Sequence, residues 1–160
     1  IQIDYEALKK DSWSEQEVKN VKLMIDFVQN LMNNHDFEYV KTHFGGQTYK
    51  QHNRGIPDGL EALVKYVKDF ADSNPDYTYD VKHIYADGDF VIFHSHATIK
   101  AKHRGDDTKG LNIMDIWLIK DGQIADHWDA LQPMDGFMRL FNLLTGGKIR
   151  NTNGVYAAAS

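Results

Sequence analysis

Two aspartates and one histidine lie in apolar surroundings in the second half of the chain, and their types suit acid/base chemistry. Asp115 interrupts the apolar run 111–119, and Asp129 follows His127 by two residues in the run 124–131. A buried carboxylate is costly if it stays charged without a partner. Apolar neighbours therefore raise the pKa of a carboxyl group toward neutrality, where it can accept or deliver a proton. These three residues are the main candidates for catalysis.

The turn at Asp121 and Gly122 decides whether these groups meet. If those two residues form the whole loop, Lys120 pairs with Gln123 and the aspartates lie on opposite faces of the hairpin. If the loop has three residues, with Gly122 in a left-handed bulge position, Ile119 pairs with Gln123 instead. The simpler alternative to a shared site is that each aspartate on these strands faces solvent and that the histidine only fills space. We expect the three-residue loop, with Asp115 opposite His127, which places on one face Ile113, Asp115, Trp117, His127 and Asp129.

A second group of polar candidates lies in the segment Tyr49-Lys50-Gln51-His52-Asn53. The segment is too polar for a buried helix. Gly55, Pro57 and Gly59 follow it, so we expect an extended or looped conformation. Polar side chains on such a segment are candidates for a functional role.

His94 and His96 are spaced two apart, so they lie on the same face of a predicted strand. With Asp115 they would complete a metal site of two histidines and one carboxylate. The simpler interpretation is a pair of neutral histidines that face Tyr79 and Val81 across the hairpin. We favour the simpler interpretation and predict no metal.

Helical periodicity dominates the first half of the chain, and strand periodicity dominates the second. Capping boxes at Ser14 with Glu17 and at Asp58 with Glu61 each open an amphipathic run. After Pro75 the apolar period changes to two, and two Asp-Gly pairs mark hairpins. We predict helices over 14–34, 36–43, 58–73 and 137–144, strands over 77–86, 90–101, 111–120 and 123–131, and a loop over 102–109. Helices followed by antiparallel strands predict an α+β domain, with helices packed on one face of a curved sheet.

Composition excludes several classes of protein. A chain of 160 residues with 42% hydrophobic residues is one globular domain of ordinary size. The net charge of −5 lacks the basic excess that nucleic acids select, and the absence of cysteine excludes disulfides and thiolate chemistry. No phosphate-binding loop, nucleophile elbow or zinc-protease motif is present. No apolar run approaches the ~20 residues of a membrane-spanning helix. We expect a cytoplasmic protein by default, although Ile1 in place of Met leaves a removed leader open.

Several motifs together resemble the SnoaL-like polyketide cyclase family, in particular its predicted aldol-condensation branch, within the nuclear transport factor two-like superfamily. The likeness covers about residues 18–132. It is carried by the 49–53 segment, the turn over 55–59, Asp115-Ile116-Trp117, Asp121-Gly122-Gln123-Ile124 and His127-Trp128-Asp129.

The resemblance implies a cone-shaped α+β barrel in which a curved sheet encloses an apolar cavity, usually in a homodimer and without metal or cofactor. Asp129 matches the aspartate that acts as acid/base in that family. Asp115 stands where those enzymes have a histidine, which is a departure from the pattern. Gln51 falls near a family asparagine, with His52 beside it.

We therefore expect an enzyme that abstracts a proton next to a carbonyl of an apolar small molecule, in an aldol cyclisation, an isomerisation or a related lyase step. Asp129 would remove the proton, and His52 or Gln51 would donate a hydrogen bond to the enolate oxygen. His127 or Asp115 would position Asp129. The expected substrate contacts are Tyr49, Gln51, Trp117, Ile113 and His96. Two alternatives remain: a non-catalytic small-molecule-binding module of the same fold, and a metal enzyme that uses His94, His96 and Asp115.

The same considerations divide the chain into three parts. Residues 1–13 are an N-terminal extension, 14–147 form the SnoaL-like domain, and 148–160 form a C-terminal tail. Because the tail has little to bury, we expect it to be frayed or to lie as an arm over a neighbouring subunit.

Overall fold

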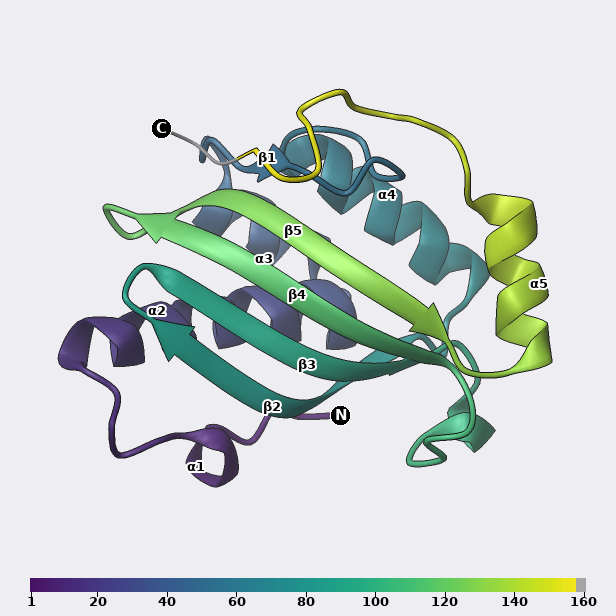
Figure 1. Ribbon diagram of the computed structural model, residues 1–160, viewed down its shortest axis with the longest axis horizontal. Coiled ribbons are helices and arrows are strands. Elements are labelled where there is room, and N and C mark those ends of the chain that lie inside the picture. The colour runs from purple at the N-terminus through teal and green to yellow at the C-terminus, as the bar shows by residue number, and fades with distance from the viewer. Residues whose placement is uncertain (158–160) are drawn as a thin grey trace.

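A five-stranded sheet in the order β1-β5-β4-β3-β2 is the centre of the computed structural model, which describes residues 1–157 (Figure 1). Strands β2 to β5 pair in antiparallel fashion, as predicted, whereas β1 pairs in parallel with β5. The short β1 lies in the polar segment that was expected to be extended or looped. The strands are β1 (Lys50–Gln51), β2 (Thr78–Asp87), β3 (Phe90–Thr98), β4 (Leu111–Lys120) and β5 (Gln123–Pro133).

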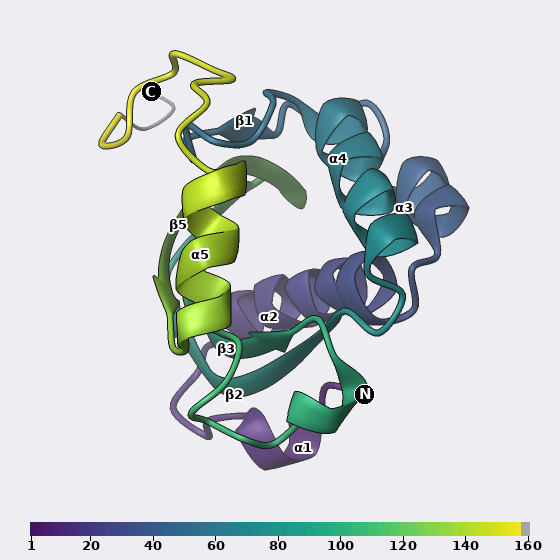
Figure 2. The same cartoon turned by 90° about the vertical axis from the view of Figure 1, so that its right-hand side faces the viewer.

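The helices lie mainly on the concave side of this sheet. Figure 2 shows the sheet curving around one side of the molecule, with α2, α3 and α4 on the other. The buried face of α2 packs into the core through Val21, Met24 and Phe27, which are almost fully inaccessible to solvent. This is the predicted α+β architecture. The helices are α1 (Tyr5–Leu8), α2 (Glu15–Val28), α3 (Phe37–Phe44), α4 (Leu60–Ser73) and α5 (Gly136–Thr145), with a π-helical turn over Gln29–Asn33.

One predicted helix cap forms and the other does not. The capping box of Ser14 and Glu17 is present at the start of α2. At α4, however, Gly59 occupies the N-cap position with a φ of 89° and no side chain caps the helix. The predicted capping box at Asp58 is therefore wrong. The Asp58 carboxylate instead accepts the backbone N–H of Gln51 at 2.9 Å, which ties the start of α4 to the polar segment.

The hairpin between β4 and β5 differs from the prediction in its turn but not in its faces. Lys120 pairs with Gln123, so the expected three-residue loop is wrong. Asp121 and Gly122 both have positive φ, which is typical of a two-residue turn. A register shift beside Leu118 then places one extra residue in β5, which is a β-bulge. Beyond the bulge, each side chain of β5 points to the face opposite to the one it would otherwise occupy. As a result Asp115 pairs with Asp129 and Trp117 with His127, all on the concave face. The predicted position of Asp115 opposite His127 is therefore wrong.

The C-terminal tail also differs from the prediction. Residues 148–157 fold back over the chain's own β1 region, as Figure 1 shows, so the described part of the tail is not frayed. The backbone N–H of Arg150 donates to the carbonyl of Arg54, and the Asn151 side chain is buried. The last part of the predicted tail, residues 158–160, lies outside the described residues.

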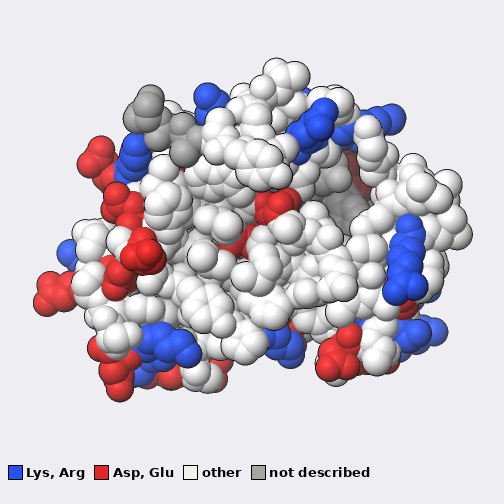
Figure 3. Space-filling model, in the orientation of Figure 1, with Lys and Arg blue, Asp and Glu red and all other residues white. Residues whose placement is uncertain are grey.

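The surface carries its charges toward the rim of the sheet. Figure 3 shows the convex sheet face mostly uncharged in its middle apart from a few acidic atoms near the centre, with most acidic and basic side chains around the edge. No broad basic patch appears on this face. Among residues 1–157, none of the helices has the length and apolarity needed to cross a bilayer.

Candidate active site

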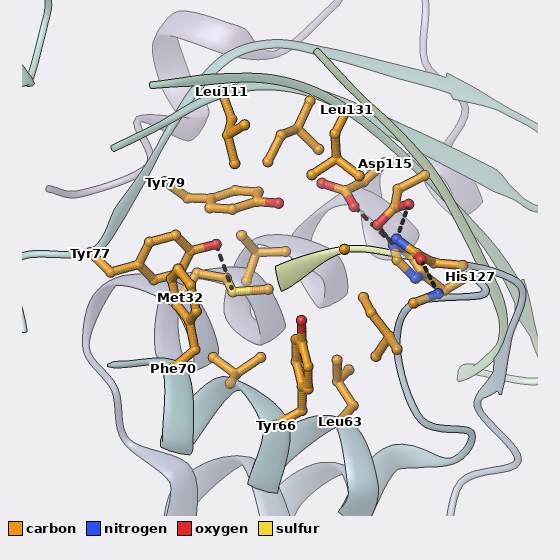
Figure 4. A pocket seen from close by; sticks show the side chains of 18 of the residues that line it. Met32, Leu63, Tyr66, Phe70, Tyr77, Tyr79, Leu111, Asp115, His127 and Leu131 are labelled. Carbon is orange, nitrogen blue, oxygen red and sulfur yellow. Dashed lines mark hydrogen bonds and ion pairs between the residues drawn. The ribbon is translucent and has the colours of Figure 1, made fainter. Parts of the chain in front are cut away.

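A cavity of about 320 Å³ lies between the concave face of the sheet and helices α2, α4 and α5. Figure 4 shows its side chains, which converge from the sheet above and from α4 below. Most of the lining is aliphatic or aromatic, and its polar groups gather at the end nearest β4 and β5. An apolar enclosure with a few convergent polar groups is the usual form of a small-molecule site.

The polar end of the cavity is built from Asp115, His127 and Asp129, referred to below as the Asp–His–Asp cluster. His127 Nε2 lies 2.8 Å from Asp115 Oδ1 and 3.9 Å from Asp129 Oδ2. The pairing of β4 with β5 brings these groups together, because Asp115 stands directly across from Asp129. The imidazole thus has one hydrogen-bonded carboxylate and a second one within electrostatic range.

Gln51 fixes the orientation of the His127 ring. Its Oε1 lies 2.8 Å from His127 Nδ1 and also accepts the backbone N–H of Asn53 at 3.0 Å. A carbonyl oxygen can only accept, so Nδ1 carries a proton and donates to Gln51. The side of the ring that faces Asp115 is Nε2, which lies within hydrogen-bonding distance of the carboxylate.

Asn53 fixes Asp129 in the same way. Its amide Nδ2 donates to Asp129 Oδ1 at 2.5 Å, and its Oδ1 accepts the backbone N–H of Gly55 at 2.8 Å. The second contact distinguishes the oxygen from the nitrogen of the side-chain amide, so the amide nitrogen faces the carboxylate. Asn53 also lines the cavity.

Burial and charge shift the proton affinities of the cluster. Burial raises the pKa of Asp129, the charge of Asp115 adds to that effect, and His127 and the Asn53 hydrogen bond oppose it, leaving a value of about 6. Burial lowers the pKa of His127, but the hydrogen bond to Asp115 and the charges of both aspartates outweigh it, so the pKa is raised above its ordinary value. Near neutral pH the cluster therefore holds an ionised Asp129 beside a histidine that binds a proton more tightly than a free imidazole.

Three of the predicted substrate contacts line this cavity. Tyr49, Ile113 and Trp117 all contribute to its wall. Burial raises the pKa of the Tyr49 hydroxyl well above its ordinary value, and Trp117 opposes this to a smaller extent. The buried Trp117 Nε1 has no hydrogen-bond partner among the described residues.

His52 does not lie where the sequence predicted. It was expected to face the substrate, but it lies on the convex face of the sheet, where its Nε2 is 2.7 Å from Asp126 Oδ1 and its ring stacks on Trp128. Side chains alternate between faces in an extended segment, and Gln51 and Asn53 occupy the cavity side. Gln51 itself meets His127 rather than the cavity, so it acts behind the cluster.

His96 and His94 also lie on the convex face. His96 Nε2 is 2.7 Å from the carbonyl oxygen of Lys109, and His94 Nε2 is 2.6 Å from Asn112 Oδ1. The predicted substrate contact of His96 is therefore wrong. The alternative metal site is wrong as well, because Asp115 faces the cavity through the opposite side of the sheet.

A different set of residues has metal-ligating chemistry. Ligand atoms of Asp115, His127 and Asp129 lie within 4.8 Å of one another. For His127 to bind a cation, however, Nε2 would have to leave Asp115 while Nδ1 stayed on Gln51. Both ring nitrogens are already engaged, so the arrangement suits proton sharing better than coordination.

Two features of the site were missed from the sequence. Asn53 was part of the polar segment but was given no role, although its spacing of two from Gln51 and four from Tyr49 puts all three on one side of an extended chain. The second feature is the group of cavity tyrosines, Tyr66 on α4 and Tyr79 on β2, whose hydroxyls point into the cavity in Figure 4. In the sequence Tyr66 appears only as a member of an apolar pattern. Tyr79 was expected to face His94 and His96, which is wrong, because these histidines pair with His83 and Asp80 on the other face of the sheet.

Comparison with known protein families gives one match. A profile for a SnoaL-like domain matches residues 25–127, which is more than half of the chain. Comparison with curated proteins gives no match.

Solved structures give the same fold. A candidate polyketide cyclase from Bacillus cereus ATCC 10987 is 20% identical with a TM-score of 0.62, over 86% of this chain and 89% of that one. AclR, a candidate hydroxylase from Streptomyces galilaeus, is 18% identical with a TM-score of 0.58, over 81% and 96%. Bal32a, from a soil-derived mobile gene cassette, is 14% identical with a TM-score of 0.62, over 78% and 98%. At these identities the likeness establishes the fold alone.

Proposed function

The chain belongs to the SnoaL-like domain family, and we propose that it is a cofactor-independent enzyme that removes a proton next to a carbonyl group of a small apolar molecule. The observation that carries this proposal is the Asp–His–Asp cluster at the polar end of an otherwise apolar cavity. Aldol cyclisation, isomerisation and related lyase steps all begin with such a proton removal, so the site supports the class rather than one member of it.

Asp129 is the base in this proposal. Its carboxylate takes the proton from the carbon next to the carbonyl, the C–H electron pair becomes the new C=C bond, and the carbonyl π electrons move onto oxygen to give an enolate. A pKa of about 6 leaves Asp129 ionised at neutral pH and still basic enough to accept a proton. The neutral acid that results can return its proton to the product.

His127 and Asp115 position this base and set its charge. The imidazolium, held by Gln51 on one side and Asp115 on the other, keeps Asp129 ionised in an apolar enclosure. A base that is fixed by hydrogen bonds loses little orientational freedom when the substrate binds.

Asn53 is the donor to the enolate oxygen. One hydrogen of its Nδ2 is used by Asp129, and within residues 1–157 no protein acceptor takes the other. The donor and the base are therefore side by side, which is the arrangement required for a carbonyl and its neighbouring carbon. This replaces His52, to which the sequence analysis gave the role.

Deuterium exchange into 2-tetralone, an apolar ketone with an activated methylene, tests the proposal. We expect the protein to accelerate exchange in D₂O, followed by proton NMR, and Asp129→Asn to lose about 10³-fold of that acceleration while still binding the ketone. Asp121→Asn, in the turn of the same hairpin and outside the cavity, is the matched control and should exchange like the original protein. Equal exchange by Asp129→Asn would disprove the assignment of the base.

The alternative is a binding module whose cavity holds an apolar ligand without reaction. The mostly apolar lining supports it. In the same experiment this alternative predicts saturable binding of 2-tetralone with no exchange above the background rate.

We also propose that the protein forms a homodimer. The mostly uncharged middle of the convex sheet face supports this (Figures 1 and 3), because such a surface loses little solvation of charge on association. Sedimentation equilibrium that gives the mass of a single chain at micromolar concentration would rule the dimer out.

A further inference from the structure

The segment that aligns the Asp–His–Asp cluster has little secondary structure of its own. Strand β1 ends at Gln51, and after the His52 N–H bonds the carbonyl of His127 at 2.9 Å the chain leaves the sheet. Nevertheless residues 51–56 supply both partners of the cluster, Gln51 to His127 and Asn53 to Asp129. Whatever holds this segment in place therefore decides the geometry of the site.

Asp58 and the pairing with β5 hold the start of the segment, and the C-terminal tail binds its carbonyls. The Asn151 amide Nδ2 donates both of its hydrogens, to the carbonyls of Asn53 at 2.7 Å and Ile56 at 2.8 Å. The Asn153 side-chain amide donates to the carbonyl of Gln51 at 2.8 Å. The backbone N–H of Arg150 donates to the carbonyl of Arg54 at 2.7 Å. These bonds satisfy backbone carbonyls that the sheet does not reach.

Asn151 is built for this task. Its side chain is only 8% exposed, and its Oδ1 accepts the N–H of Asn153 at 3.2 Å, so each of its polar atoms has a partner. A carboxylate of the same shape would offer no hydrogens to the two carbonyls and would place four oxygens together.

His52 anchors the tail at its far end. Its Nδ1 donates to the carbonyl of Gly154 at 2.7 Å, while Nε2 meets Asp126 beneath the sheet edge. Trp128, which stacks on the same ring, donates through Nε1 to the carbonyl of Ala157 at 3.0 Å. These contacts give His52 a role on the convex face, where it cannot meet the substrate.

We infer that residues 150–154 form a clamp in which Asn151 and Asn153 are positioning residues for the proposed reaction. The clamp acts through the main chain of residues 51–56: it holds Asn53 against Asp129 and Gln51 against His127. This inference rests on the proposed function for its effect on catalysis, but the clamp's effect on the cluster exists in the ligand-free protein. The tail is thereby part of the site rather than an appendage to it.

The test is the titration of the Asp129 carboxyl carbon by NMR in ligand-free protein, with Asn151→Ala and Asn151→Asp as the disrupting variants. Because the Asn53 hydrogen bond lowers the pKa of Asp129, release of Asn53 should move the measured midpoint upward by ~0.5 pH units or more. Tyr156→Ala, at a tail side chain that is 97% exposed, is the control and should leave the midpoint unchanged.

Exchange into 2-tetralone provides the second readout. Both Asn151 variants should lose about tenfold in kcat with little change in KM, because the apolar walls that bind the ketone are intact. If a variant at Asn151 does not fold, Asn153→Ala, which removes one hydrogen bond from a half-buried side chain, decides the question by the same titration. An unchanged Asp129 midpoint in a folded variant overturns the clamp. If the midpoint is unchanged but Asp129→Asn still loses exchange, the clamp is wrong and the proposed function stands. Failure of the clamp is therefore distinguishable from failure of the proposed function.

Discussion

Strand β5 contributes to two buried histidine–carboxylate pairs, one on each face of the sheet. On the concave face His127 Nε2 lies 2.8 Å from Asp115 Oδ1, and on the convex face His52 Nε2 lies 2.7 Å from Asp126 Oδ1. Judged by distance and burial the pairs are almost the same. The inner pair differs because it faces a cavity and has a second carboxylate, Asp129, within reach. The outer pair is covered by Trp128 and the C-terminal tail.

This difference separates a structural pair from a reactive one. In both settings the histidine is hydrogen-bonded to one carboxylate oxygen, and the other oxygen, Oδ2 of Asp115 or of Asp126, is buried with no hydrogen-bond partner among the described residues. What adds chemistry on the inner face is a third titratable group whose pKa burial has raised to about 6, next to space for a substrate. Access to the cavity and the presence of Asp129 therefore matter more for reactivity than the geometry of the histidine–carboxylate pair.

The largest expected difference between the pairs lies in activity. Asp115→Asn removes the anion that holds the His127 imidazolium, so the ionised form of Asp129 loses its counter-charge. We expect exchange into 2-tetralone to fall about 100-fold at pH 7, measured by NMR on protein whose folding is checked by circular dichroism. An Asp115→Asn protein that exchanges at the original rate would remove the inner pair from the mechanism.

The outer pair should show its effect in stability. Asp126→Asn leaves His52 without its anionic partner in a fully buried setting, and we expect the free energy of unfolding in urea to fall by about 1–3 kcal/mol. Exchange by the folded variant should fall much less than in Asp115→Asn. Equal losses of exchange in the two variants would show that the pairs are not functionally distinct.

The third expected effect, similar in size to the second and confined to high pH, is a gain in stability on the inner face. The pKa of Asp129 is about 6 in the folded protein, against an ordinary value of 3.8. A carboxyl whose pKa is raised by folding favours the folded state at low pH, and that contribution is lost as the pH rises from about 4 through about 6. Asp129→Asn should therefore raise the free energy of unfolding by about 1–3 kcal/mol at pH 8 and by little at pH 4.

Urea unfolding at the two pH values measures this gain, with Asp121→Asn as the control for loss of one acidic group. A variant that is equally stabilised at pH 4 and pH 8 would contradict a raised pKa at Asp129. Destabilisation at pH 8 would show that the charged carboxylate contributes more to folding than its burial costs.

Much of the fold was accessible from the sequence because its local signals agree. The capping box at Ser14, the change of period after Pro75 and the two Asp-Gly turns each predict an element that the structure contains. The common face of Asp115 and Asp129 was also predicted, but for the wrong reason. The turn is two residues long, and the bulge at Ala125 supplies the change of face that was assigned to the turn. A bulge is set by packing across strands and leaves no local signature here.

The errors at the site have two physical origins. The prediction for His52 is wrong because side chains alternate along an extended chain, which puts Gln51 and Asn53 on one side and His52 on the other. The tail was misjudged because its partners are backbone carbonyls about a hundred residues away. Asn151 and Asn153 satisfy carbonyls at residues 51, 53 and 56, and nothing in the composition of the tail identifies them.

The pH dependence of exchange into 2-tetralone tests the central claim most directly, that Asp129 is a base held ready by burial and by its neighbours. The account predicts a rate that rises with pH through a midpoint near 6, as Asp129 ionises. It also predicts a fall at higher pH as His127 loses its proton, and no rise near pH 6 in Asp129→Asn. A rate that is independent of pH between 4 and 8, or a rise near pH 6 that persists in Asp129→Asn, would contradict it.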